Sequence, residues 1–312
     1  MGTANTPVIN GLSVDIEDWF QVGAFEHCID RGDWDRLERR VEANTDRVMA
    51  LFDRAGVKGT FFTLGWVAER APALIRRIVD AGHELASHGY DHQRVFRMTA
   101  AEFAADLARA RALLEDAGGV AVTGYRAPSF SIDTRTPWAH ATLAQAGYAY
   151  SSSVAPVVHD HYGWPQSPRF AWAPLADAPL VELPVTTARF AGRTLAAGGG
   201  GFFRMLPYAF SRWAVGQVNA LGQPAILYFH PWEVDPHQPR VAGAPLRSRL
   251  RHYSRLDAME GKLERMLADA RWGRIDALVP ALAAQLATPN PPAATTPAAS
   301  TASTASTQAH AA

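Results

Sequence analysis

Short apolar runs alternate with longer segments of helical periodicity along residues 8–125 of the chain. Runs rich in β-branched and aromatic residues predict buried strands, whereas apolar residues three and four positions apart predict helices with one buried face. The pattern predicts strands at residues 8–19, 57–65, 83–86 and 120–125, and helices at residues 36–55, 72–81 and 100–117. Strands and helices that alternate with short joints predict an α/β fold built on a parallel sheet.

The first predicted strand begins as an apolar run and ends in three acids, Asp15, Glu17 and Asp18. A buried parallel strand has this form when its carboxyl end delivers carboxylates to a functional site. The same acids also fit a simpler role, in which they cap the turn that follows the strand. The residues alone leave both roles open.

Two histidines, His88 and His92, stand four residues apart after the third predicted strand. On one helical turn this spacing places both imidazoles on the same face, where both can bind one metal ion. Surface or capped histidines on a polar turn have the same spacing. Because the carboxyl ends of parallel strands open at one edge of the sheet, we expect these histidines to meet the acids there. Two imidazoles and one carboxylate leave coordination positions open for water and substrate, which is typical of catalytic divalent sites and also of iron oxygenases.

Two further polar residues follow predicted strands. Arg126 comes after residues 120–125 and before a proline-stiffened loop. An arginine there can fix a carboxylate by a bidentate pair, and a structural ion pair is an equal alternative. His230 follows a fifth predicted strand, residues 224–229, where it fits a general acid or a buried core histidine.

Composition narrows the class of partner and the compartment. The chain has 312 residues, of which 48% are hydrophobic and 19% charged, enough to bury a full core. Its formal net charge is zero, which gives no electrostatic case for nucleic acid or an anionic membrane as the main partner. Cys28 is the single cysteine, which excludes an internal disulfide and fits a reducing compartment. With no signal-peptide pattern and no long apolar run, we expect a cytoplasmic protein without a transmembrane segment.

The order of these motifs resembles that of the NodB-type polysaccharide deacetylases, carbohydrate esterase family 4. Asp15 with the acids after it is similar to the first motif of that family. The later motifs are similar to residues 87–92 (SHGYDH), 126–128 (RAP) and 227–230 (LYFH), and the strand around Thr60 also resembles one in the family. The resemblance extends over residues 12–233, and four motifs in order make it far more specific than any one of them.

The resemblance implies a distorted (β/α) barrel of about seven strands and metal-dependent hydrolysis of N-acetyl groups. In that scheme Asp15 is the general base, oriented by Arg126, and His230 protonates the leaving amine. His88 and His92 hold one divalent ion together with a carboxylate. Zinc is the expected ion, and cobalt, nickel, manganese and iron are alternatives.

The substrate is expected to contact the loop after Arg126. Backbone N–H groups near Ser129 and Phe130 are candidates for an oxyanion site. Residues 154–193 are rich in proline and aromatic residues and are expected to form long loops that wall a cleft. The residues expected to contact the sugar are Pro128, Ser129, Phe130 and Trp232. Trp232 is also a candidate for stacking on a sugar ring, as are Tyr162, Trp164 and Trp172, although buried packing is favoured over stacking for any one of these four.

Two positions depart from the family pattern. Where the first motif usually has adjacent aspartates, this chain has Asp-Ile-Glu-Asp, so the carboxylate ligand is either Asp18, which we prefer, or Glu17. Ser151 stands where relatives usually carry an aspartate. If that acid tunes His230 in the relatives, its role here is missing or is taken by another group such as Asp160.

Other segments resemble a subgroup found with exopolysaccharide and PEP-CTERM (exosortase) loci. These segments are residues 14–22, 199–204 (GGGFFR) and 230–233 (HPWE), and the subgroup carries an extra C-terminal region that residues 251–253 (RHY) resemble. Residues 245–270 predict a helix with an apolar stripe. We therefore expect a deacetylase domain at residues 1–240, a helical extension at residues 241–288 and a disordered Ala/Thr/Ser/Pro tail at residues 289–312.

The expected function is removal of N-acetyl groups from a bacterial exopolysaccharide or its precursor, with peripheral association with a synthesis complex left open. Two alternatives remain. The same site can act on a small non-sugar amide, or the chain can bind glycan without hydrolysing it, for which Ser151 is the hint.

Overall fold

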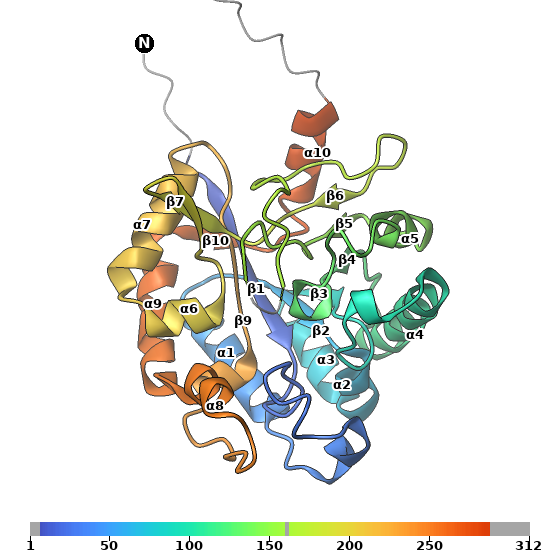
Figure 1. Ribbon diagram of the computed structural model, residues 1–312, viewed down its shortest axis with the longest axis vertical. Helices are drawn as coiled ribbons and strands as arrows, with labels where there is room; N and C mark the ends of the chain where they lie inside the picture. Colours follow the sequence, from blue (N-terminus) through green and yellow to red (C-terminus); the bar gives the residue numbers. More distant parts are fainter. Residues whose placement is uncertain (1–6, 160–161, 288–312) are drawn as a thin grey trace, which may run out of the picture.

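The computed structural model describes residues 7–159 and 162–287. The predicted tail at residues 289–312 and the candidate Asp160 lie outside the described residues. Parallel strands form one curved sheet with helices around its outside (Figure 1). The predicted α/β class is confirmed, and the expected distorted barrel has the form of a curled half-barrel.

The sheet is centred on β1 (Ile9–Ile16), whose residues from Asn10 onward are buried. Its order is β10-β1-β2-β3-β4-β5-β6, with β9 paired to β1 as well, and every pairing in it is parallel. The remaining strands are β2 (Thr60–Thr63), β3 (Glu84–Ser87), β4 (Gly124–Tyr125), β5 (Tyr150–Ser151), β6 (Val181–Glu182), β9 (Ile226–Phe229) and β10 (Arg271–Gly273). A separate antiparallel pair joins β7 (Thr187–Phe190) to β8 (Arg193–Ala196).

Amphipathic helices cover the sheet because their apolar faces pack on it. In α1 (Val41–Arg54), for example, Val48, Leu51 and Phe52 are fully or almost fully buried. The other helices are α2 (Gly65–Arg70), α3 (Pro72–Asp80), α4 (Ala100–Gly118), α5 (Ala139–Gln145), α6 (Gly200–Met205), α7 (Tyr208–Asn219), α8 (Leu246–Tyr253), α9 (Met259–Asp269) and α10 (Val279–Ala287). Short 3₁₀ turns occupy Arg31–Arg36, Val95–Arg97, Pro128–Phe130, Pro231–Val234 and Leu256–Ala258.

Several predicted elements are shorter than the sequence pattern indicated. The helix expected at residues 36–55 begins at Val41, after a 3₁₀ turn, and the strand expected at residues 120–125 is reduced to Gly124–Tyr125. The first strand ends at Ile16, so the acids that follow it lie just past the sheet. None of the helices in the described ranges is both long and apolar enough to span a bilayer.

The C-terminal region contributes helices, as predicted, and also a strand. Residues 245–270 form two helices rather than one, α8 and α9, and Arg255 between them has φ 54°. The apolar stripe is buried as expected and comprises Leu256, Met259, Leu263, Met266 and Leu267. The chain then adds β10 beside the first residues of β1, next to the stretch from Gly11 to Val14 that pairs with β9. The region after residue 241 is therefore part of the sheet.

Candidate active site

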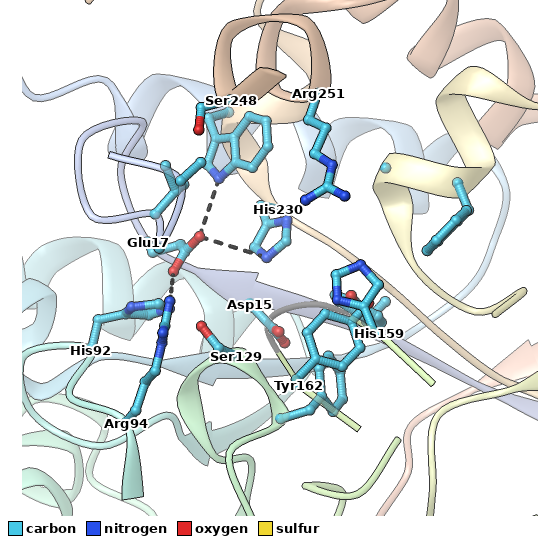
Figure 2. A pocket seen from close by; sticks show the side chains of 18 of the residues that line it. Asp15, Glu17, His92, Arg94, Ser129, His159, Tyr162, His230, Ser248 and Arg251 are labelled. Carbon is cyan, nitrogen blue, oxygen red and sulfur yellow. Dashed lines mark hydrogen bonds and ion pairs between the residues drawn. The ribbon is translucent and has the colours of Figure 1, made fainter. Parts of the chain in front are cut away.

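The carboxyl ends of β1, β3, β4 and β9 open at one edge of the sheet, as the parallel topology requires. A cavity of about 390 Å³ lies at this edge. It is lined by Asp15, Glu17, His88, His92, Ser129, Phe130, His230 and Trp232, among others (Figure 2). The structure thus brings most of the candidate residues from the sequence into one place.

Glu17, His88 and His92 form a group that can hold a metal ion. One ligand atom from each lies within 4.8 Å of the others, and all three residues are buried. The two imidazoles do not share a helical turn as expected, because residues 88–94 form a loop after β3. In that loop Gly89 has φ 76° and His92 has φ 60°, so left-handed backbone turns the second imidazole back toward the first.

The protonation of His88 suits a metal ligand. Its Nδ1 lies 2.8 Å from the carbonyl oxygen of Arg126, and an N–H donated there leaves Nε2 with a free lone pair. Burial lowers the pKa of His88 to about 4, with the charge of His92 acting in the same direction, so the ring stays neutral. Neutral imidazole is the form that binds metals.

Glu17 supplies the matching carboxylate. Its Oε2 lies 2.9 Å from Nε2 of His92, and no other donor of the described residues reaches this oxygen. A protonated His92 would form an ion pair with Glu17 here, whereas with neutral imidazoles the buried oxygen and the two ring nitrogens fit a cation. Burial alone would raise the pKa of Glu17, but the nearby charges of His92 and His230 lower it to about 2, which keeps the carboxylate ionised.

Asp18, the carboxylate preferred from the sequence, lies elsewhere. Its Oδ1 accepts from the backbone N–H of Trp19 at 2.9 Å, and its Oδ2 accepts from those of Arg40 and Val41 at 2.8 and 3.1 Å. Asp18 therefore caps the start of α1, the simpler role that the sequence left open for these acids. Burial raises its pKa to about 6 despite these bonds. We replace Asp18 by Glu17 in the candidate ligand set.

Asp15 is held by Arg126 through one contact rather than the expected bidentate pair. Nη1 of Arg126 donates to Asp15 Oδ1 and to Ser13 Oγ, both at 2.7 Å. The other guanidinium nitrogens donate to Ser152, Nη2 to Oγ at 2.9 Å and Nε to the carbonyl at 3.0 Å. The guanidinium is fully buried and lies over the Phe62 ring. Because this network uses Oδ1, the second oxygen of Asp15 can interact with a group in the cavity.

His230 lies on the opposite wall of the cavity. Its Nδ1 is 3.0 Å from Glu233 Oε2, and its Nε2 is 3.5 Å from Glu17 Oε1. Burial opposes protonation, but the charges of Glu17 and Glu233 raise the pKa of His230 to about 9. A protonated imidazole that faces a cavity can act as a general acid.

Trp232 does not have a ring face free for a sugar. Its ring is stacked between His230, with centroids 5.1 Å apart, and His252, at 4.1 Å. Its indole N–H donates to Glu17 Oε1 at 3.2 Å (Figure 2). The stacking role is therefore wrong, and Trp232 instead orients a candidate ligand.

The loop after Arg126 is only partly placed as expected. Ser129 and Phe130 line the cavity with φ of 56° and 48°, whereas Pro128 is not among the lining residues. The backbone N–H of Phe130 donates to the carbonyl of Ala127 at 3.0 Å, so it is not available as an oxyanion donor. The N–H of Ser129 remains a candidate.

The predicted stacking aromatics divide between the cavity and the protein interior. Tyr162 lines the cavity, but Trp164 packs edge-on against Trp172 at 6.1 Å, and neither tryptophan is among the lining residues.

Ser151 is buried and donates to Ser153 Oγ at 2.8 Å. The acid beside His230 is Glu233, which the sequence reasoning missed. Its position three residues after the histidine, on one side of a 3₁₀ turn, was the available signal.

Comparisons with known proteins agree with this fold. Residues 27–151 match the family model described as polysaccharide deacetylase, and residues 152–280 match a domain of unknown function, DUF3473. The crystal structure of a protein from Mycobacterium smegmatis, provisionally named as a polysaccharide deacetylase, superposes with a TM-score of 0.57 at 23% identity. That match covers 92% of this chain and 97% of the other, and it shows a shared fold.

Two curated relatives are similar over shorter stretches. A peptidoglycan deacetylase of Helicobacter pylori is 33% identical over 113 residues, which are 36% of this chain and 38% of that protein. A peptidoglycan-N-acetylglucosamine deacetylase of Bacillus cereus is 28% identical over 96 residues, 30% and 35% of the two chains. The matched part thus spans little more than a third of each of these relatives.

The curved parallel sheet and its edge residues define an α/β protein with a two-histidine, one-carboxylate group beside a further acid and histidine. Within that class, residues 27–151 carry a polysaccharide deacetylase domain of the NodB, carbohydrate esterase family 4 type. Residues 152–280, which match the DUF3473 model, follow directly as a DUF3473 region.

Proposed function

We propose that this protein is a metal-dependent deacetylase that hydrolyses N-acetyl groups on a glycan. The observation that carries the proposal is the juxtaposition, in one cavity, of the Glu17, His88 and His92 group with Asp15 and His230. The match of residues 27–151 to the polysaccharide deacetylase model supports the same reaction.

The side chains divide the reaction between two walls of the cavity. A divalent ion held by Glu17, His88 and His92 would polarise the amide carbonyl and acidify water. On one wall Asp15, with Oδ1 fixed by Arg126, accepts the proton of the attacking water on its other oxygen. On the other wall His230 gives the proton on Nε2 to the departing amine, which leaves acetate and a free amino sugar.

The finer assignments also belong to this proposal. Zinc suits two imidazoles and one carboxylate with open positions, and cobalt, nickel, manganese and iron accept the same ligands. The glycan is a bacterial exopolysaccharide or its precursor, which the motifs at residues 199–204 and 230–233 support. A cytoplasmic location with peripheral association with a synthesis complex accords with this substrate.

The experiment is acetate release from N-acetylglucosamine oligomers, with the wild type beside His88→Ala. The side chain of His27 is 83% exposed, so His27→Ala controls for loss of a histidine as such. We expect release by the wild type and by His27→Ala but not by His88→Ala. Equal release by all three proteins contradicts the proposal, and release only from a small non-sugar amide moves the activity to that substrate class.

A further inference from the structure

Three motifs, of which the proposed reaction uses only His230 directly, meet around the back of that histidine. They are residues 199–204 on α6, residues 230–233 after β9 and residues 251–253 on α8. They lie far apart in sequence, and all three belong to the DUF3473 region. Their contacts converge on one buried carboxylate, Glu233.

Glu233 binds His230 at two points. Its Oε2 accepts from the backbone N–H of His230 at 3.0 Å and lies 3.0 Å from Nδ1 of the same residue. With Nδ1–H donated to Glu233, the ring directs Nε2 toward Glu17 and the cavity. The carboxylate therefore sets both the tautomer and the direction of the imidazole.

Arg204 fixes Glu233 from the other side. Its Nε donates to Glu233 Oε1 at 2.7 Å, and both side chains are only 1% exposed. The Arg204 guanidinium also donates to the carbonyl oxygens of Ser254 and, at 3.1 Å, Arg251. The end of α8 thus fixes the Arg204 guanidinium, and Arg204 in turn fixes the Glu233 carboxylate.

The glycine run of α6 has a steric reason in this network. A Cβ at Gly200 would lie 2.0 Å from Glu233 Oε2, so only glycine lets the helix approach this closely. Lys262 of α9 adds three contacts from its Nζ to the carbonyl oxygens at the end of α6, those of Phe203, Arg204 and Leu206. The helix that supplies Arg204 is anchored at both ends.

Ser151, the position where the family resemblance leads us to expect an aspartate, is not connected to this network. Ser151 donates to Ser153 Oγ at 2.8 Å, and within the described residues it makes no hydrogen bond to His230 or Glu233. Burial opposes ionisation of Glu233, yet the charges of Arg204 and His230 lower its pKa to about 2. Glu233 is thus a permanent anion at the back of the imidazole.

We infer that Glu233 is the positioning residue of the proton donor His230, and that the DUF3473 region exists in part to hold it in place through Arg204. The inference rests on the proposed deacetylation. It assigns a task to a region whose family description assigns none.

Glu233→Gln tests the inference because it keeps the shape of the side chain and removes the charge. We compare amide hydrolysis of N-acetylglucosamine oligomers with hydrolysis of 4-nitrophenyl acetate, whose leaving phenolate needs no proton. The rate of His88→Ala is subtracted from each. We expect kcat for the amide to fall by about 100-fold, the upper range for lost outer partners of a site residue. KM, metal content and the ester rate should change little.

The matched control is Glu182→Gln. Glu182 forms a second buried pair with a histidine, His140, at 3.1 Å, and neither residue lines the cavity. A general loss of packing would lower amide and ester rates together in either variant. Glu233→Asp keeps the charge at shorter reach and should recover part of the amide kcat that Glu233→Gln loses. An equal loss of amide and ester hydrolysis in Glu233→Gln, or no loss of either, overturns the inference.

A measurement without substrate separates this inference from the proposed function. In the ¹⁵N-edited NMR spectrum of the wild type we expect a slowly exchanging Nδ1–H of His230, assigned by its absence in His230→Gln. This proton should exchange faster in Glu233→Gln but not in Glu182→Gln. If the wild type releases no acetate from any N-acetylated sugar, the proposed function fails, and an unchanged Nδ1–H in Glu233→Gln then rejects the positioning role on its own evidence.

Discussion

The two walls of the cavity are built by different means. On the first wall, Asp15 and His88 lie at or just past the ends of paired strands, so strand register sets their spacing, and Arg126 lies buried beside Asp15. On the second wall, His230 is directed by the buried ion pair of Glu233 with Arg204, which joins segments far apart in the chain. Backbone register gives the first wall positions that single side-chain changes do not move, whereas the second wall depends on a few charges.

Because the two walls are built differently, substitutions on each wall should impair the proposed reaction in different ways. Changes on the first wall are expected to weaken binding of the proposed ion or to remove the proposed proton acceptor, with the sheet intact. Changes on the second wall are expected to alter the direction of one imidazole without loss of the proposed ion. The variants below separate these outcomes.

The largest effect is expected from Glu17→Gln, which removes the proposed anionic ligand. Because even the outer partners of metal ligands contribute 10- to 100-fold to affinity, we expect metal affinity to fall by at least about 100-fold and acetate release to disappear. Calorimetric titration with Zn²⁺ measures the affinity. A variant that binds zinc as tightly as the wild type rules Glu17 out as a ligand.

Asp15→Asn should leave the ion and abolish most of the turnover. Asparagine can still accept from Arg126 but cannot take a proton from water, so we expect kcat to fall by about 10²- to 10⁴-fold. Metal content and the urea unfolding midpoint should stay close to those of the wild type. Retained turnover in this protein would show that the proton acceptor lies elsewhere.

A pH effect on stability is expected from Glu84, far from the cavity chemistry. Burial and the negative charge of Asp276 raise the pKa of Glu84 from 4.5 to about 7, although Thr60 and Tyr150 hydrogen-bond to it. Between these two values the folded protein binds more protons than the unfolded chain, so the free energy of unfolding falls as the pH rises, by up to about 3 kcal/mol.

Urea unfolding at pH 5 and pH 7.5 measures this slope. Glu84→Gln should remove most of it, because glutamine carries no proton to lose. The slope that remains belongs to other buried acids with raised pKa values, such as Asp106 at about 6. Identical slopes in variant and wild type would exclude Glu84 as the source.

The smallest effect is expected from Asp18→Asn, the neighbour of the proposed ligand. The change weakens the cap on α1 and should lower the free energy of unfolding by about 1–2 kcal/mol. Zinc affinity should remain that of the wild type, in contrast to Glu17→Gln. Loss of zinc from Asp18→Asn with zinc retained in Glu17→Gln would restore the assignment first preferred from the sequence.

The parallel sheet was predictable where strands carry their own pattern. The run at β2 is aromatic and β-branched, and the runs at β1 and β9 predict buried strands through their apolar residues. Strands β1, β3 and β9 lead directly into Glu17, His88 and His230. Strands of two or three residues, such as β5, β6 and β10, show no periodicity of their own and form only through pairing with distant neighbours.

The site residues, like the strands, could be predicted only where the local sequence specifies their position. Residues at strand ends could be predicted to gather at one edge because topology requires it. The choice between Glu17 and Asp18 depends on which way an extended chain points each side chain, and alternation places Glu17 on the same side as Asp15. The pairing of Glu233 with Arg204 depends on how α6 packs behind β9, which no local pattern specifies.

The most direct test of the account is acetate release from N-acetylglucosamine oligomers by metal-stripped protein as Zn²⁺ is added back in known amounts. The account predicts no release without metal, a rise in proportion to zinc up to one ion per chain, and no rise in Glu17→Gln or His88→Ala. Full release by the stripped protein, or equal restoration in the two variants, would contradict a metal centre at Glu17, His88 and His92.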